Sequence, residues 1–429
     1  MANINKIIWA VAIAMIFLNS IYFSIKLKFP QLKLKIILKT ILKKEEKSNN
    51  ISSKDTLLMS LASKIGAGSL AGISFAIFYG GIGTVFWMWI ASFFVSINCF
   101  LENVLSTIYK EKDGDFYKGG PAYYLKKGLN KKTLSIIYSI LAIGAYIFGF
   151  LAIQNNTITT LVTEMYEIPK ILIALIVTII SSFAIIKGLK TISNVCNKIV
   201  PIMTTIYLIL GFIVIITNIE AIPTVLVNIV QQAFSKQAVT GGAIYTFIIG
   251  MQKGIFANEA GVGTSAISSG ATSNKDPIKQ GFIGIIETYF ISLFITTVTA
   301  LIVILSNYQS LNLTNINGIE ITKFAFSTHF GHFGEIILLI VLILFSFSTI
   351  ITGYYYGESN LKNLTKDKIK IIVLKILAIL SIFLGGIISS LFVWEIVDLF
   401  IALLAIINIY AIFKLRNTIF EKVKSKTIK

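Results

Sequence analysis

Two short motifs place glycine next to a charged residue inside apolar stretches of the sequence. The first is KIGAGS at Lys64–Ser69, and the second, 195 residues later, is EAGVGT at Glu259–Thr264. Both run charge, apolar, Gly, apolar, Gly, hydroxyl. Glycine weakens a helix and lets a ligand approach the backbone closely. A broken helix offers free N–H groups to a carboxylate and free carbonyls to a cation. The two motifs therefore indicate a site for a small zwitterion and an ion.

A purely structural role for these glycines is the alternative, because small residues let packed helices come close together. That role explains the GGIG run at Gly80–Gly83 well. It explains the two matched motifs poorly, because each carries a charge at a depth where a bilayer makes charge costly. We therefore interpret the motifs as functional and Gly80–Gly83 as packing.

The composition indicates a membrane protein that crosses the bilayer several times. Of 429 residues, 55% are hydrophobic and 14% are charged, whereas a soluble chain has about 25% charged residues. The net charge of +18 does not indicate a nucleic-acid partner, because the lysines occupy short loops between apolar segments and Arg416 is the only arginine. An intramembrane enzyme would need a paired nucleophile and base, which the sequence lacks. A channel would not need two matched breaks.

We expect eleven membrane-spanning helices. Their approximate limits are Ile7–Ile25, Leu57–Tyr79, Thr84–Ile108, Leu134–Thr160, Ile171–Ile186, Ile199–Thr217, Ala238–Gly270, Phe282–Leu305, Ile336–Gly357, Leu377–Phe392 and Val393–Phe413. The first has no cleavage signal, so we interpret it as a retained span.

The positive residues predict the orientation of these spans. If the spans alternate, 32 Lys and Arg residues lie on one side, and only Lys6, Lys170, Lys236 and Lys323 lie on the other. Positive loops stay inside the cell. The amino terminus is therefore expected outside and the carboxyl terminus in the cytoplasm. The segment Lys26–Lys44 is either a helix on the inner membrane surface or a basic connector.

The placement of the motifs predicts an inverted repeat. If the first span is an added helix, the motifs lie in helices 1 and 6 of a ten-helix core, in halves of opposite orientation. The predicted fold is all-α, with core helices 1 and 6 broken. Its parts are a leading helix (1–29), a basic surface segment (30–56), a first five-helix repeat (57–218), a second repeat (219–414) and a basic tail (415–429).

The sequence resembles the alanine or glycine:cation symporter family of bacteria and archaea along nearly its whole length. The most specific match is GIFANEAGVG, followed by DPIKQG at Asp276–Gly281. Supporting matches are GTVFWMW (Gly83–Trp89), GGPAYYL (Gly119–Leu125), GLKTISNVCNKIVPIM (Gly188–Met203) and YYYGE (Tyr354–Glu358). The resemblance implies the leucine-transporter type of fold, preceded by one helix, and uptake of alanine or glycine driven by sodium or protons.

The resemblance also implies particular binding residues. The substrate site would comprise Ala67, Gly68 and Ser69 at the first break, Phe256, Asn258 and Gly261 at the second, and Gln154 from the third core helix. Sodium would lie between the carbonyls of Ile65 or Gly66 and the hydroxyls of Ser348 and Thr349.

This chain departs from the family pattern Thr-x-Gly-Thr-Gly-Asn at three positions of the first motif, where it has Lys64, Ala67 and Ser69. Gly353 stands where a tryptophan is expected and could enlarge the substrate pocket. Ser292 stands where an aspartate is expected. The departures leave the coupling ion and the size of the substrate open.

Lys64 has three interpretations. It could pair with Glu259, although the opposite directions of the two helices make direct pairing uncertain. Its ammonium could replace the driving cation and carry a proton. It could also extend to the inner interface. Glu102 and Glu287 lie near inner helix ends, where an interfacial position suffices for Glu102 and is open for Glu287.

The sequence as a whole predicts a monomeric, multi-pass transporter in the plasma membrane that imports alanine or glycine with sodium and uses no organic cofactor. Proton coupling or sodium-independent transport through Lys64 is the alternative. His329 and His332 are expected in a solvated outer loop rather than a zinc site. The only partners expected are the amino acid, the coupling ion and the lipid bilayer.

Overall fold

The computed structural model describes residues 2–43, 45, 50–235, 242–311, 316–388 and 390–427. This part of the chain is helical except for its loops and one hairpin, in which β1 (Glu111–Asp113) pairs antiparallel with β2 (Phe116–Lys118). The prediction of an all-α protein is confirmed. Several predicted features fall outside the described residues. They are the start of the seventh span (238–241), Lys236, positions 44 and 46–49 of the basic segment, and the last two residues of the tail.

Nine helical segments of the described part are long and apolar enough to cross a membrane. They are α1 (Ala2–Lys26), α5 (Thr84–Tyr109), α7–η3–α8 (Lys132–Ile143, Gly144–Phe150, Leu151–Tyr166), α9 (Lys170–Lys187), α10 (Leu189–Thr217), α14–η4–α15 (Pro277–Tyr289, Phe290–Thr296, Thr297–Ile304), α16 (Gly318–Leu364), α17 (Lys368–Ile387) and α18 (Ser390–Lys414).

A tenth span is broken in the middle. Helix α3 (Ser53–Lys64) is followed, after a bend of 57°, by the π-helical segment η2 (Gly68–Gly72) and α4 (Ile73–Gly80). The predicted seventh span is also divided, into α12 (Gly242–Asn258) and α13 (Thr264–Gly270). Both interruptions fall on the two glycine motifs.

The remaining elements are short. They are η1 (Pro30–Leu32), α2 (Leu34–Ile41), α6 (Pro121–Lys127), α11 (Ile222–Ala233), η5 (Tyr308–Ser310) and α19 (Arg416–Thr427). Within the basic segment, Lys28 and Phe29 adopt positive φ angles of 57° and 50°, so the chain turns after α1 and α2 forms a separate helix.

The predicted ninth span, Ile336–Gly357, lies within α16, which begins earlier, at Gly318, where Asn317 and Glu320 form a capping box. The helix changes direction at Gly331, whose φ is 61°, so the span lies in its second part. Two local expectations were wrong. His329 and His332 are helical and not in a loop. Cys196 falls between the predicted spans Ile171–Ile186 and Ile199–Thr217, where a short loop was expected, but it is buried in α10.

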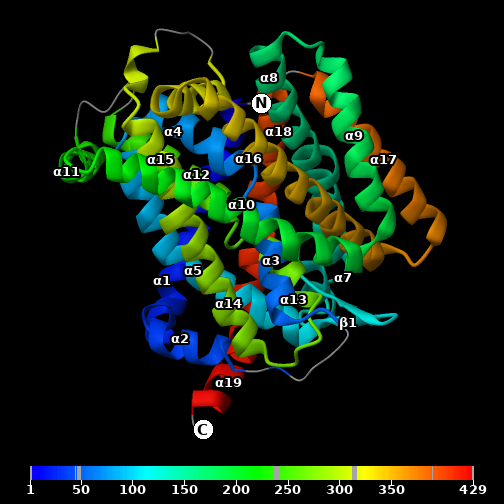
Figure 1. Cartoon of the computed structure of the whole chain (residues 1–429). Helices are drawn as coiled ribbons and strands as arrows, with labels where there is room; N and C mark the ends of the chain where they lie inside the picture. Colours follow the sequence, from blue (N-terminus) through cyan, green and yellow to red (C-terminus); the bar gives the residue numbers. More distant parts are fainter. Residues whose placement is uncertain are drawn as a thin grey trace.

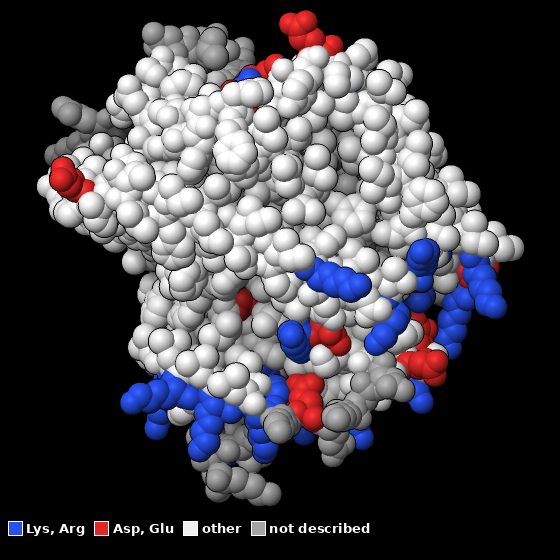
Figure 2. Space-filling model, viewed as in Figure 1, with Lys and Arg blue, Asp and Glu red and all other residues white. Residues whose placement is uncertain are grey.

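Figure 1 shows how the helices surround the two breaks. Helices α8, α9 and α17 form one side of the bundle, and α1, α5 and α14 form the other, with α3, α13 and α16 between them. The carboxyl terminus, α2, α19 and the hairpin lie together at the lower end. Figure 2 shows that Lys and Arg gather at this same end, whereas the apolar middle of the visible face carries almost none.

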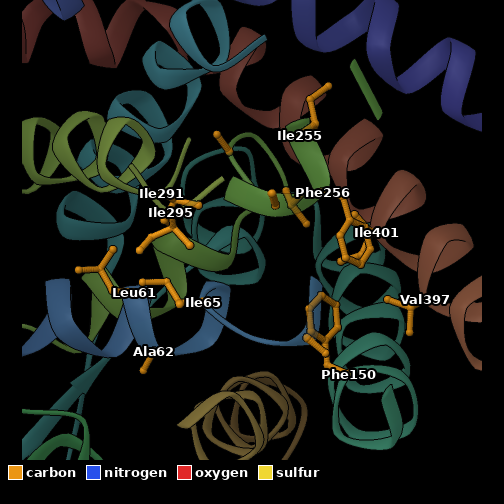
Figure 3. Close-up of a cluster of buried hydrophobic side chains, with 14 of the residues drawn as sticks. Leu61, Ala62, Ile65, Phe150, Ile255, Phe256, Ile291, Ile295, Val397 and Ile401 are labelled. Atoms are coloured by element: carbon orange, nitrogen blue, oxygen red, sulfur yellow. The ribbon is translucent and has the colours of Figure 1, made fainter. Parts of the chain in front are cut away.

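The apolar core extends directly to the breaks (Figure 3). Leu61 and Ile65, at the end of α3, lie beside Ile291 and Ile295 of η4, and all four are buried. The π-helical segments η2, η3 and η4 all lie in spans that border this region, and such wide turns are common at functional sites.

Candidate functional site

The first break lies between α3 and η2, and it has little room for side chains. A Cβ atom on Gly66 would lie 2.6 Å from Thr349 Oγ1 and 2.9 Å from Gln154 Oε1, so only glycine fits there. The backbone N–H of Ala67 donates to Gln154 Oε1 at 2.9 Å. Ser69 Oγ donates to the carbonyl of Lys64 at 2.9 Å and so helps to close the end of α3.

The second break, residues 259–263, depends on left-handed backbone conformations. The φ angles are 49° at Glu259, 87° at Gly261 and 102° at Gly263. A residue with a Cβ rarely adopts such angles, which explains the two glycines of this motif. Glu259 adopts a strained conformation, which is typical of functional positions.

At the second break, two backbone carbonyls that have lost their helical partners accept hydrogen bonds from side chains instead. Asn408 Nδ2 donates to the carbonyl of Gly261 at 2.9 Å, and the Tyr138 hydroxyl donates to that of Val262 at 2.9 Å. Asn408 also donates to Glu102 Oε2 at 2.8 Å. Backbone groups at membrane depth require such internal partners. Sequence reasoning missed Asn408, because a single asparagine in an apolar span carries no motif.

A narrow cavity, with a volume of about 10 Å³ and so room for about one water molecule, lies between the two breaks. Its walls are made by Ser63, Lys64, Gly66, Gly68, Phe150, Ile153, Gln154, Phe256, Ala257, Glu259 and Trp394. The rings of Phe150 and Phe256 stack with their centroids 6.0 Å apart, and Figure 3 shows them close to each other. The cavity therefore combines backbone of the first motif, an amide and an aromatic wall.

The predicted substrate residues separate into two groups. Gly68, Gln154 and Phe256 line the cavity. Ala67 contributes its N–H to Gln154, while Ser69, Asn258 and Gly261 do not belong to the lining.

The last two of these residues serve the second break itself. The side-chain carbonyl of Asn258 accepts from the N–H of Ala260 at 3.0 Å, and its amide donates to Ser292 Oγ at 3.1 Å. A Cβ atom on Gly261 would meet Ile409 and Asn98 rather than the cavity. The predicted enlargement of the pocket at Gly353 has no support, because Gly353 faces Leu151 and not the cavity.

The two hydroxyls of the predicted cation site meet α3 at one carbonyl. Ser348 Oγ lies 3.2 Å, and Thr349 Oγ1 2.9 Å, from the carbonyl oxygen of Ala62. The resemblance to the family had implied the carbonyl of Ile65 or Gly66 instead. Ala62 precedes Ile65 by three residues, on the same face of the helix. Backbone oxygens carry no signal in the sequence, so the Ala62 carbonyl could not be identified from its residue type.

Lys64 forms a buried ion pair with Glu287 of α14 rather than with Glu259. Both side chains are almost completely buried, so the expectation that Lys64 extends to an interface was wrong. Glu102 is also fully buried, not interfacial, and its Oε1 has no hydrogen-bond partner among the described residues. The same is true of Glu259 Oε2. The Lys64 ammonium is bonded to α14, whereas the hydroxyl pair belongs to α16.

A second, wider cavity lies next to the first, with Trp394 in the wall of both. Lys253 borders this outer cavity, and its Nζ lies 3.5 Å from Asp398 Oδ2. The same ammonium lies 5.2 Å from the ring centre of Phe256 and 5.6 Å from that of Trp394, both within cation–π range. Trp394 is therefore shared by the two cavities, and one ammonium group lies close to this ring and to that of Phe256 in the wall of the inner cavity.

At the lysine-rich end, a polar network joins the start of α3 to α14. Glu45 accepts from the Ser53 N–H at 3.1 Å and pairs with Lys279 at 3.0 Å. Burial raises the pKa of Glu45, but the bonds from Ser53 and Lys279 lower it more, so the net pKa is below the usual value. Gln280 Nε2 also donates to Ser53 Oγ at 2.6 Å.

Lys110 extends this network to the end of α13. Its ammonium donates to the carbonyls of Thr272 and Asn274 at 2.7 and 2.5 Å. Burial, together with the charge of Lys275, lowers the pKa of Lys110 to about 8. The network joins the two broken helices at this end. The outer cavity lies on the other side of the rings of Phe256 and Trp394.

Comparison with known proteins identifies what this arrangement is similar to. The family model described as "Sodium:alanine symporter family" matches residues 1–427. The amino-acid carrier protein AlsT of Bacillus subtilis is 33% identical over 422 residues, which cover 98% of this chain and 90% of AlsT. The sodium/alanine symporter AgcS of Methanococcus maripaludis is 29% identical over 438 residues, covering 99% and 96% of the two chains.

Solved structures share the fold at low sequence identity. A crystal structure of MhsT in complex with L-phenylalanine matches with a TM-score of 0.58 and 11% identity, over 85% of this chain and 89% of that one. A sodium-coupled sialic acid symporter matches with a TM-score of 0.53 and 13% identity, over 94% and 82%. The leucine-transporter type of fold implied by the sequence is thereby confirmed.

Proposed function

The chain belongs to the sodium:alanine symporter family, and from this premise we propose that it imports alanine or glycine together with sodium by alternating access. At the coarser level it is a cation-coupled amino-acid transporter. The observation that carries the finer proposal is the small cavity between the breaks, which adjoins a backbone carbonyl faced by two hydroxyls.

The proposed arrangement has eleven spans, with α12 and α13 together forming the seventh. One leading helix precedes two five-helix repeats of opposite orientation, at residues 57–218 and 219–414. The amino terminus faces outside, and the lysine-rich end seen in Figure 2 faces the cytoplasm. In this orientation the outer cavity at Lys253 faces the cell exterior, and the network at Glu45 and Lys110 closes the cytoplasmic end.

The substrate carboxylate binds near the first break, where the N–H of Ala67 points toward Gln154. Gly68 and Gln154 line the cavity at this end, while Phe150 and Phe256 bound the side-chain end of the pocket. The short distance of 3.1 Å from a Cβ on Gly68 to Phe256 favours a small substrate. Alanine and glycine are the smallest amino acids, and the cavity widens to admit them.

Sodium binds beside Ala62, Ser348 and Thr349, where oxygen atoms from α3 and α16 converge. Unwound carbonyls and hydroxyls hold sodium in transporters of this architecture. A cation bound there holds α3 against α16, so substrate and ion stabilise the same closed state. No organic cofactor is needed.

Proton coupling or sodium-independent transport is the second candidate, and the buried pair of Lys64 and Glu287 favours it. A proton moved onto Glu287 would break the pair and leave a lysine charge at membrane depth. A relative in Bacillus subtilis, 30% identical, is named a putative sodium/proton-dependent alanine carrier.

Uptake by proteoliposomes tests both candidates. Purified protein is reconstituted, and labelled alanine uptake is measured with an inward sodium gradient, a proton gradient or potassium alone. Saturable uptake that requires sodium supports the first proposal. If unlabelled alanine, glycine, serine and glutamine all fail to compete, the substrate proposal is wrong.

The role of the ion pair needs a double variant. Lys64→Thr alone leaves Glu287 buried without its partner, which costs about 3–5 kcal/mol of stability. Lys64→Thr combined with Glu287→Gln removes both charges and should melt closer to the parent. Unchanged sodium dependence in this folded double variant would exclude the pair from coupling, and newly acquired sodium dependence would assign the pair to coupling.

A further inference from the structure

A large groove opens at the lysine-rich end of the molecule, away from both breaks. Five regions form it: the turn after α1, helix α2, α5, the start of α14, and α19. Its apolar floor and walls include Phe100, Phe282, Phe420 and Ile36. None of these side chains belongs to the substrate cavity or to the proposed cation site.

The rim of the groove is strongly basic. It carries six lysines, namely Lys26, Lys28, Lys33, Lys39, Lys43 and Lys424, and one acid, Asp276. Among the described residues, no carboxylate lies within ion-pair distance of these six ammonium groups. The carboxylate of Asp276 accepts from the N–H groups of Ile278 and Lys279, at 3.0 and 3.2 Å, as the cap of α14. The positive charge of the rim is therefore not neutralised within the described part of the chain.

Helix α2 exposes apolar residues between these lysines. Leu34, Ile36 and Leu38 are each about half exposed, and Leu42 is 78% exposed. Only Ile37 of this helix is fully buried. An exposed row of leucine and isoleucine next to lysine is typical of a helix in the interface of a membrane. Figure 2 shows the corresponding cluster of basic side chains at the lower left, around the position of α2 in Figure 1.

We propose that this groove binds one anionic phospholipid of the cytoplasmic leaflet. Its phosphate lies among the lysines of the rim, and its acyl chains run over Phe282, Phe100 and Ile36. Basic pockets beside spanning helices on the cytoplasmic side recognise such headgroups. A zwitterionic lipid presents no net charge to six lysines and binds less well. The proposal rests on the proposed orientation in the membrane but not on the transported solute.

The bound lipid also has a route to the transport machinery. Helix α2 packs on α14, and α14 carries Glu287 and, through Lys279, contacts Glu45 before α3. Lys279 Nζ donates to the backbone carbonyl of Lys43 at 2.6 Å, directly beside the groove. Filling the groove holds α2 against α14 and stabilises the closed cytoplasmic end.

Native mass spectrometry of the full-length protein in detergent tests the binding. Phosphatidylglycerol and phosphatidylcholine with identical acyl chains are added separately. We expect a phosphatidylglycerol adduct that survives detergent and little adduct with phosphatidylcholine. In the variant Lys33→Gln, Lys39→Gln, Lys43→Gln, the affinity for phosphatidylglycerol should fall about tenfold or more, since each lysine near an anionic surface contributes to binding.

The matched control removes three exposed lysines from outside the groove, with Lys366→Gln, Lys368→Gln and Lys370→Gln. It should retain the parent's affinity, and melting curves verify that both triple variants fold. If both variants lose affinity for phosphatidylglycerol equally, net charge alone explains the binding and the proposed site is wrong. Displacement of the lipid by excess glycerol phosphate would assign the groove to a free phosphate. A dimer in place of the lipid adduct, lost only in the Lys33, Lys39 and Lys43 variant, would assign it to a second copy of the chain.

Discussion

The two helix breaks have matching sequences, but different groups satisfy their backbones. At the second break, Asn408 and Tyr138 donate hydrogen bonds to the carbonyls of Gly261 and Val262, respectively. At the first break, the N–H of Ala67 meets Gln154, whose side chain lines the cavity and can exchange its partner for a ligand. We therefore propose that the first break binds the substrate and that the second holds the geometry against which binding occurs.

The same difference appears in the charges of the two motifs. Lys64 is neutralised by Glu287, a residue of another helix. Glu259 keeps one oxygen without a partner among the described residues, at a position where its own backbone is strained. A motif repeated in two halves thus need not have the same task in both. Variants at each break can separate binding from stability.

The largest effect is expected for Gly68→Leu in the first break. A Cβ atom there lies 3.1 Å from the Phe256 ring, so the rest of a leucine side chain fills the cavity. Alanine uptake should fall by about a hundredfold or more, equivalent to about 2.8 kcal/mol of lost binding. Labelled alanine uptake in proteoliposomes measures this, with a melting curve to verify folding. If the folded variant takes up alanine as fast as the parent does, the substrate does not bind at this break.

A smaller effect is expected when both hydroxyls facing Ala62 are removed. The variant Ser348→Ala, Thr349→Ala loses two oxygens beside α3. The sodium concentration for half-maximal uptake should rise about tenfold or more, or about 1.4 kcal/mol. Ser346→Ala, which removes a buried hydroxyl on the same helix, is the matched control and should leave this concentration unchanged. An equal response of both variants would contradict a cation site here.

Asn408→Leu is expected to lower stability more than transport. The change leaves the Gly261 carbonyl and Glu102 without their donor, and each unsatisfied buried group costs about 1–3 kcal/mol. The melting temperature should fall by several degrees, while the protein that remains folded still binds alanine. Gln154→Leu is the matched change at the first break. It should weaken alanine binding more than it lowers the melting temperature. If the two variants behave alike, the proposed division between the breaks fails.

The smallest effect is expected for Tyr138→Phe, which removes one hydrogen bond to Val262 at the second break. The loss of stability should be about 1 kcal/mol, with the affinity for alanine unchanged. Thermal unfolding and equilibrium binding are measured on the same preparation. A loss of affinity without a loss of stability would place the second break in the binding site.

The sequence predicted the features that local patterns encode. Glycines beside a charge in an apolar stretch predicted the position of both breaks, and the lysine-rich loops matched the basic end of the molecule. Gln154 was identified through the resemblance to a family, and it does line the cavity. Local pattern and family resemblance together were sufficient for the fold and for one wall of the site.

Contacts between distant residues could not be predicted in this way. Glu287 lies 223 positions from Lys64, and nothing in either neighbourhood marks the pair. The role of Asn408 could not be predicted, because its partners Glu102 and Gly261 are distant in the sequence. The resemblance to a family also implied that Asn258 and Gly261 line the pocket, whereas their side of the second break faces α5, η4 and α18. Similar sequence at two breaks did not imply similar exposure to the cavity.

Equilibrium binding of labelled alanine to the purified protein tests whether the first break holds a sodium-dependent alanine site. Binding is measured with sodium and with choline in its place, for the parent and for Gly68→Leu. We expect saturable binding by the parent that sodium strengthens, and none by the folded variant. Binding of equal affinity in both proteins, or no binding of alanine, glycine or serine by the parent in sodium, would contradict it.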